Sequence, residues 1–378
     1  MNAITIVHFI TDLQMGGAER MLARLVTASD RHAFRHVVIT LTPGGPFHDQ
    51  IRAAGLEIHD LGMRRGRPSL SALWRAVQLL RRIKPHVVQT WLYHADALGS
   101  VAARLAGCPK VCWNLRCSDM DLSRYGRATR WVVQFLARIS PSIDLILSNS
   151  QAGITAHQSL GYRGKRWMLI PNGVELGTYR PDPAARRQWR SQLGLAEDCV
   201  VFLMVARRDP MKDHPGFLSA ARQVAANHAN IAFIAAGRGV DQDADLRTMA
   251  AAIAAPVHLL GQTQPIESLM AAADVGVLAS HFGEGFPNVL AESMACGLPC
   301  IATDVGDAAQ VVGDTGQVLP PGDTKALAAA MARWEDPAMP LAAMGQAARQ
   351  RVEQLYDITS IIRQYEDMWS DLVRLTGD

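Results

Sequence analysis

The sequence lacks the marks of several large protein classes. Its 378 residues include no apolar run of the roughly 18 residues that a membrane-spanning helix needs. The first residues, MNAITIVHFITDLQ, have no basic segment ahead of the apolar one, so we expect a first strand there and no signal peptide. Aromatic residues make up only 6% of the chain, and no recognised nucleic-acid-binding motif is present, so we expect no nucleic-acid partner.

Cysteine is scarce as well. The six cysteines form no CxxC pair, and no histidine cluster accompanies Cys296 and Cys300, which flank a predicted helix end. This pattern favours neither a metal site nor a disulfide framework. We therefore expect reduced, buried thiols in a cytoplasmic protein.

The chain does have enough apolar residues to fill two cores. Hydrophobic residues make up 49% of it and charged residues 19%, which is typical of a globular protein of two domains. The charge is uneven: residues 1–175 contain 22 Lys and Arg against 11 Asp and Glu, a net +11, while the whole chain carries +3. The basic first half predicts an anionic partner, either a phosphate-bearing substrate or the anionic surface of a membrane.

Apolar runs of strand length alternate with segments of helical spacing along the chain. This alternation predicts parallel sheets with helices on both faces. The first strand, at residues 4–10, is followed by Gly16–Gly17 and a helix at residues 18–28. In a doubly wound sheet this loop borders the ligand site, although a glycine pair is also common in simple turns.

A turn or linker at Pro171–Gly173 separates two such series. The second series begins with a strand at residues 199–205, and the loop after it carries Arg207 and Lys212. Two cations at the carboxyl end of a strand could neutralise a diphosphate, although a solvated basic loop is the ordinary alternative.

Residues 280–307 combine a glycine-rich loop with the start of a helix between two predicted strands. Free N–H groups and the helix dipole make such a place suitable for phosphate. Glu284 lies in the loop and Glu292 about one turn into the helix, so both carboxylates can face one crevice and accept hydrogen bonds from hydroxyls. This arrangement suits a sugar nucleotide, although the two acids could also be merely solvated.

The segment GEGFPNVLAESMACGLPCIATDVGD, residues 283–307, resembles the donor-site signature of the retaining glycosyltransferases of family 4. MGGAER, WLYHADALGSVAARLAG, DLILSNSQAG and IPNGV also resemble segments of this family. The resemblance implies the GT-B fold, with two Rossmann-like, doubly wound parallel-sheet domains facing a cleft. Residues 1–172 would hold the acceptor, joined by a C-terminal helix at about 357–378 that crosses back to them. Residues 173–356 would hold the donor.

The resemblance also implies a role for each donor-site residue. Glu284 would contact the sugar, and Glu292 the nucleotide ribose. Arg207 and Lys212 would hold the diphosphate and stabilise the leaving group in place of a metal. The remaining donor-side residues, which would lie against the diphosphate, are Gly285, Phe286, Pro287, Asn288 and Val289 in the donor loop, and Gly16 and Gly17 in the first domain.

These roles describe a retaining, metal-independent enzyme that needs no cofactor. It would move a sugar from a nucleotide diphosphosugar, with a UDP-sugar as the expected donor, to a glycan or lipid-linked glycan in polysaccharide or cell-surface glycan synthesis. Two alternatives remain open: a GT-B nucleotide-sugar epimerase, and a non-catalytic scaffold that binds nucleotide sugars.

One position departs from the family pattern. Many members have a histidine after the strand that here has the sequence KVCWN, whereas we align Arg116 with it. Arginine cannot act as a base, but it can hold an anion. Either Arg116 contacts a donor or acceptor phosphate, or His94 takes part of that role; Ser118 and Asp119 are further candidates on the acceptor side.

A predicted helix at residues 125–139 follows this region. Arg124, Arg127 and Arg130 lie at its start, next to apolar and aromatic residues. Such a helix can dock on a membrane, although a core-facing helix with solvated arginines has the same pattern. We expect a cytoplasmic protein that attaches peripherally to the cytoplasmic face of the membrane.

Overall fold

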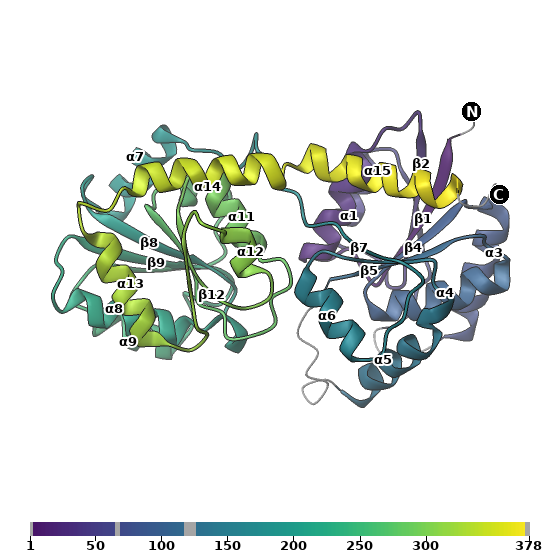
Figure 1. Ribbon diagram of the computed structural model, residues 1–378, viewed down its shortest axis with the longest axis horizontal. Coiled ribbons are helices and arrows are strands. Elements are labelled where there is room, and N and C mark those ends of the chain that lie inside the picture. The colour runs from purple at the N-terminus through teal and green to yellow at the C-terminus, as the bar shows by residue number, and fades with distance from the viewer. Residues whose placement is uncertain (1–2, 65–68, 117–125, 375–378) are drawn as a thin grey trace. The chain divides into compact units, whose positions relative to one another are not determined.

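The computed structural model describes residues 3–64, 69–116 and 126–374, except for the side chain of Arg127. The chain forms two compact units. The first comprises residues 1–173 and 359–378, and the second residues 174–358. Each unit is a parallel sheet between layers of helices (Figure 1), because near-continuous apolar strands must be covered on both faces.

The first unit has a seven-stranded sheet in the order β3-β2-β1-β4-β5-β6-β7. Its strands are β1 (Ile4–Ile10), β2 (Phe34–Thr40), β3 (Glu57–Asp60), β4 (Val87–Trp91), β5 (Val111–Leu115), β6 (Leu145–Ser148) and β7 (Trp167–Leu169). Its helices are α1 (Gly17–Ala28), α2 (Pro46–Ala53), α3 (Leu70–Ile83), α4 (Tyr93–Ala106), α5 (Arg127–Ile139), the 3-10 turn η2 (Ser140–Ser142), α6 (Gln151–Ser159) and α15 (Ile358–Arg374). The short, polar β3 is a strand that the apolar pattern did not predict.

Side chains of β1 alternate between the two faces of this sheet. Val7 and Phe9 join the core beneath α3 and α4. His8 points to the opposite face, where its ring lies near those of His36 and Trp369. The Trp369 indole N–H donates to Oε1 of Gln89 over 2.8 Å. The last helix, α15, therefore completes the core of the first unit.

The second unit has a six-stranded sheet in the order β10-β9-β8-β11-β12-β13. Its strands are β8 (Val200–Val205), β9 (Ile231–Ala236), β10 (Val257–Leu260), β11 (Val275–Leu278), β12 (Cys300–Thr303) and β13 (Gln317–Leu319). Its helices are α7 (Pro183–Leu193), the 3-10 turn η3 (Pro210–Lys212), α8 (His214–Ala225), α9 (Ala244–Ala251), α10 (Ile266–Met270), α11 (Asn288–Ala295), α12 (Ala308–Val312), α13 (Thr324–Glu335) and α14 (Leu341–Leu355). Val201 and Leu203 of β8 pack on one face, and Phe202 and Met204 on the other.

Two parallel α/β sheets of this kind are the predicted fold class, which is thereby confirmed. Within the described residues, no helix has the length and apolarity needed to cross a membrane. The described cysteines are all free thiols.

Candidate functional site

The strand order of the second unit reverses between β8 and β11. In open parallel sheets ligands bind outside the carboxyl ends of the strands at such a switch point. Here the loop after β8 leads through η3 to α8, and the loop after β11 leads to α11. The structure therefore places the predicted cations, Arg207 and Lys212, and the predicted carboxylate Glu284 on two loops that meet at the switch point.

Glu284 lies where these two loops meet. Its Oε1 accepts a short hydrogen bond from Nζ of Lys212 and a second one, of 2.6 Å, from the Ser280 hydroxyl. All three side chains are largely shielded from water. Among the described residues both donors reach Oε1, so Oε2 keeps its lone pairs for a ligand hydroxyl. Lys212 donates one of its three ammonium protons to Glu284.

The loop that carries Glu284 is fixed by its backbone. Gly283 has φ +80°, and a Cβ there would collide with the sulfur of Met211 in η3. The N–H of His281 donates to the Met211 carbonyl over 2.8 Å. Beyond Glu284, a Cβ on Gly306 would collide with the Glu284 carbonyl. Backbone contacts therefore hold the carboxylate from both sides, which preorganises it for a ligand.

The start of α11 follows directly. Pro287 occupies the N-cap position and makes no side-chain cap bond, so no cap side chain competes with an anion drawn to the positive end of this helix. Phe286 is buried against Tyr356, which anchors the loop below the helix start. Glu292, in the second turn, is also buried. The arrangement can bind a phosphate at the helix end and hydroxyl groups at the two glutamates.

Arg207 is held differently from Lys212. Its guanidinium, about half exposed, pairs with Asp209 through Nε at 3.1 Å and Nη2 at 2.8 Å. Burial tends to raise the pKa of Asp209, but the Met211 N–H and Arg207 outweigh it, so this pKa is lowered. Asp209 therefore stays ionised and positions Arg207 as a half-exposed cation at the edge of the site.

Sequence reasoning missed a third pair at this site. His281 Nε2 lies 2.9 Å from Oδ2 of Asp213, whose other oxygen accepts the N–H of Gly216 at the start of α8. Asp213 has φ +53°, a left-handed conformation that aspartate tolerates better than most residues. The pair ties the donor loop to the turn that carries Lys212. Ser280 was missed as well, and its place directly after an apolar strand was the available signal.

The first unit has its own switch point, between β1 and β4. Gly16 is the N-cap of α1, and a Cβ there would collide with the carboxylate of Glu19, which folds back over the helix start. Burial raises the pKa of Glu19 above its usual value, and the nearby Asp12 adds to this, while its own N–H and Arg116 oppose it. A phosphate approaching Gly16 and Gly17 would meet this carboxylate, which occupies the space beside Gly16.

Arg116 directly follows β5, and its guanidinium contacts neutral groups. It donates to Oδ1 of Asn172 and, over 2.7 Å, to the Tyr365 hydroxyl, and its guanidinium lies 4.6 Å from the centre of the Trp91 ring. Burial lowers the pKa of Arg116, and Tyr365 and then Glu19 counteract this. Arg116 thus links the sheet to α15, and an anion would find its Nε without a partner among the described residues.

The other acceptor-side candidates are placed as follows. His94 is exposed at the start of α4, and partial desolvation of its ring lowers its pKa. Leu92, just before α4, has φ +72°, a strained conformation for leucine at the carboxyl end of β4. Ser118 and Asp119 lie outside the described residues.

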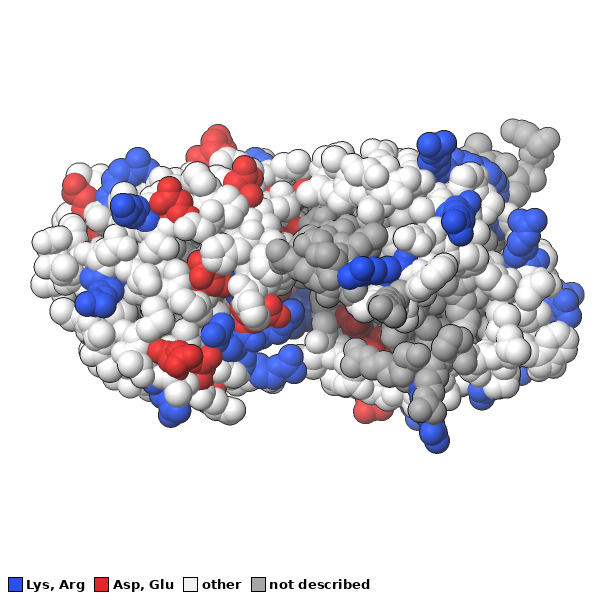
Figure 2. All heavy atoms as spheres, turned by 90° about the horizontal axis from the view of Figure 1, so that it is seen from below, with Lys and Arg blue, Asp and Glu red and all other residues white. Residues whose placement is uncertain are grey.

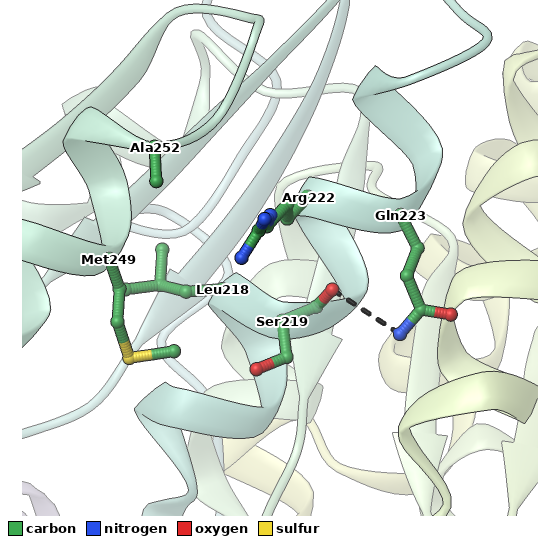
Figure 3. A pocket seen from close by; sticks show the side chains of 6 residues that line it. All are labelled: Leu218, Ser219, Arg222, Gln223, Met249 and Ala252. Atoms are coloured by element: carbon green, nitrogen blue, oxygen red, sulfur yellow. Dashed lines mark hydrogen bonds between the residues drawn. The ribbon is translucent and has the colours of Figure 1, made fainter.

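A separate hollow lies on the helical layer of the second unit (Figure 3). It has a volume of 380 Å³. Figure 3 shows side chains of α8 and α9 around it, and Gln223 bonds the Ser219 carbonyl of its own helix. The six lining residues are Leu218, Ser219, Arg222, Gln223, Met249 and Ala252. None of the predicted donor residues lines it. No group of three or more histidine, cysteine, aspartate or glutamate residues in the described part of the chain could hold a metal.

Comparison with known proteins defines the class. The model of "Glycosyltransferase Family 4" matches residues 15–178, and that of "Glycosyl transferases group 1" matches residues 199–336. The fold and site thus define a GT-B glycosyltransferase. The chain belongs to glycosyltransferase family 4, as its donor-loop signature predicted.

Relatives of known name cover most of the chain. An Escherichia coli UDP-Gal:alpha-D-GlcNAc-diphosphoundecaprenol alpha-1,3-galactosyltransferase is 25% identical over 320 residues, 80% of each chain. A GDP-mannose-dependent monoacylated alpha-(1-6)-phosphatidylinositol monomannoside mannosyltransferase from Corynebacterium glutamicum is 27% identical over 68% of this chain and 69% of its own. The crystal structure of Anabaena Alr3699/HepE with UDP and glucose superposes with a TM-score of 0.82 at 22% identity, over 97% of this chain and all of that one. The structural likeness supports the GT-B fold.

Proposed function

We propose that this glycosyltransferase uses a UDP-sugar, acts with retention and without a metal, and transfers to a glycan or lipid-linked glycan. The observation that carries the proposal is the convergence of Lys212 and Ser280 on one oxygen of Glu284 beside the start of α11. That geometry leaves the second oxygen of Glu284 to orient a sugar hydroxyl. The bond to Oε1 keeps Lys212 at the same place, where its remaining protons can bind a diphosphate.

The chemistry follows from these positions. Departure of the nucleoside diphosphate places negative charge on the phosphate oxygens, and fixed cations and N–H groups stabilise that charge in the transition state. Lys212, Arg207 and the first turn of α11 would supply this stabilisation. Glu292 would accept from the ribose and thereby anchor the nucleotide, whereas Glu284 would act on the sugar.

Retention and UDP rest on other grounds. Membership of the family supports retention. UDP is favoured because the E. coli relative uses UDP-Gal and the Anabaena structure contains UDP, while the Corynebacterium relative depends on GDP-mannose. The choice of base is therefore the first thing to test.

The test is a panel of UDP-, GDP- and ADP-sugars. Calorimetry with each intact donor and each free nucleotide, followed by product analysis with radiolabelled donor, identifies the base and detects transfer. Binding and transfer with a UDP-sugar are expected. Binding without release of the sugar to acceptor or water would instead indicate the non-catalytic scaffold, and conversion of one free sugar nucleotide into another would indicate an epimerase.

A further inference from the structure

Two helices of the first unit expose large apolar side chains to solvent. On α3, Leu70 is 86% exposed and Trp74 57% exposed; on α5, Trp131 is 69% and Phe135 39% exposed. The members of each pair are four residues apart, so they lie on the same face of their helix. We call these four residues the apolar rim. Paired exposed aromatic and aliphatic side chains are a patch of the kind that marks interaction sites.

The apolar rim has a definite place in the fold. Both helices pack against α4, which lies between them (Figure 1). Helices that follow strands of a parallel sheet begin at the carboxyl edge of that sheet, the edge on which substrates bind. Trp74 and Trp131 are each the fifth residue of their helix. The rim therefore lies toward the edge where this unit is expected to receive the acceptor.

The exposed charges on the helical layer that carries the rim have one sign. Among the described residues of α3, α4 and α5 the only acid is Asp96, which is fully buried. Figure 2 shows basic side chains outnumbering acidic ones on the visible face of the first unit, whereas the two are mixed on the second. Arg75 is exposed next to Trp74. The other exposed basic residues of these helices lie in the last turns, toward the opposite edge of the sheet: Arg81, Arg82, Arg104 and Arg138. Arg124 lies outside the described residues.

We propose that the apolar rim inserts into the interface of a bilayer that contains anionic lipids, and so holds the enzyme over an acceptor anchored in that bilayer. This rests on the proposed function and narrows its acceptor to the lipid-linked class. Tryptophan and phenylalanine favour the lipid headgroup region, and the arginines attract anionic headgroups. A second copy of the chain is a poorer occupant, because facing arginines would repel one another. A soluble acceptor would give no reason to keep the rim exposed.

The first experiment is flotation with two kinds of vesicle, phosphatidylcholine alone and phosphatidylcholine mixed with phosphatidylglycerol. The full chain is expected to float with the mixed vesicles. The double variant Trp74→Glu/Trp131→Glu is expected to partition into these vesicles at least about tenfold more weakly, because both side chains then carry a negative charge that the anionic headgroups repel. The matched control is Leu355→Glu, which places the same charge on an exposed leucine of α14 in the second unit and is expected to float like the wild type.

A second measurement separates folding and catalysis from docking. Each variant is assayed for thermal unfolding and for transfer to a water-soluble acceptor analogue and to one embedded in vesicles. If a rim variant loses transfer only to the acceptor embedded in vesicles, the result supports docking of the enzyme through the apolar rim. If Trp74→Glu/Trp131→Glu floats like the wild type, or if the wild type ignores anionic vesicles, the inference is wrong while the proposed function stands. If the wild type instead forms dimers that the double variant cannot form, the rim is a contact between copies. Normal flotation without any sugar transfer would count against the proposed function alone.

Discussion

The hydroxyl of Ser280 offers a sharp test of how the site is organised. It is buried, it donates to Glu284 Oε1 over 2.6 Å, and it reaches no substrate in the proposed roles. A hydrogen bond to a charged group contributes about 1.5–3 kcal/mol. Ser280→Ala removes this bond and leaves the bond from Lys212 as the remaining constraint on Oε1 among the described residues. If all of that energy serves to orient Glu284 in the transition state, kcat falls by about 10- to 150-fold.

The assay compares turnover with nucleotide binding. Steady-state transfer gives kcat, and calorimetry with free UDP gives the affinity of the part of the donor that Glu284 does not contact. Ser280→Ala is expected to lower kcat and to leave the Kd for UDP within about twofold, since twofold corresponds to only ~0.4 kcal/mol.

The matched control is Ser293→Ala. Ser293 is a buried serine of α11 whose side chain faces Gly276 of β11 and makes no bond to Glu284. It tests the general cost of removing a buried hydroxyl from the same unit. Equal losses of kcat in the two variants, or a loss of UDP affinity that matches the loss of kcat in Ser280→Ala, would refute the positioning role of Ser280.

Three further predictions concern the carboxylates, metals and pH. Glu292→Gln should weaken UDP and UDP-sugar binding alike, by about 1.5–3 kcal/mol, whereas Glu284→Gln should lower turnover and keep UDP binding; calorimetry showing equal losses would contradict these roles. Activity should persist in EDTA because Arg207 and Lys212 neutralise the diphosphate, and activity restored only by magnesium or manganese would show the opposite. Burial lowers the pKa of His8, and that of His36 to about 4, so the unfolded chain takes up protons first as the pH falls below about 6.5. Urea unfolding should therefore show the first unit losing about 2 kcal/mol between pH 7.5 and 5 from His36 alone, and a His36→Gln variant should show a flatter dependence.

The sequence predicted the regular elements well where local signals were strong. The predicted bounds 4–10, 18–28 and 199–205 agree to within one residue with β1, α1 and β8, because the apolar runs there are bounded by glycine or polar loops. The sequence pattern did not predict β3. Its four residues, EIHD, show no alternation of apolar side chains, because a short strand at the edge of a sheet can be largely polar.

The site was less predictable than the fold. Lys212 and Glu284 were identified, but the contact between them joins residues 72 apart and depends on the left-handed Asp213 and on Gly283. No local pattern contains that information, so the pairing of His281 could be found only from the structure, whereas Ser280 offered one signal, its place directly after an apolar strand. Arg116 is the reverse case. Because it is an arginine, we predicted that it binds an anion, and the structure shows that it also donates hydrogen bonds to Asn172 and Tyr365.

The place of α15 has a consequence for how the protein is made. The first unit needs Tyr365 and Trp369 in its core, and Glu366 binds the Ser29 hydroxyl and the Asp30 N–H, each over 2.8 Å, at the end of α1. These residues are synthesised after the whole second unit, although the sheet they cover is synthesised before it. The second unit is contiguous in the chain and can finish folding earlier. A nascent chain, or one terminated before α15, therefore presents an uncovered sheet face to chaperones and proteases until α15 is in place.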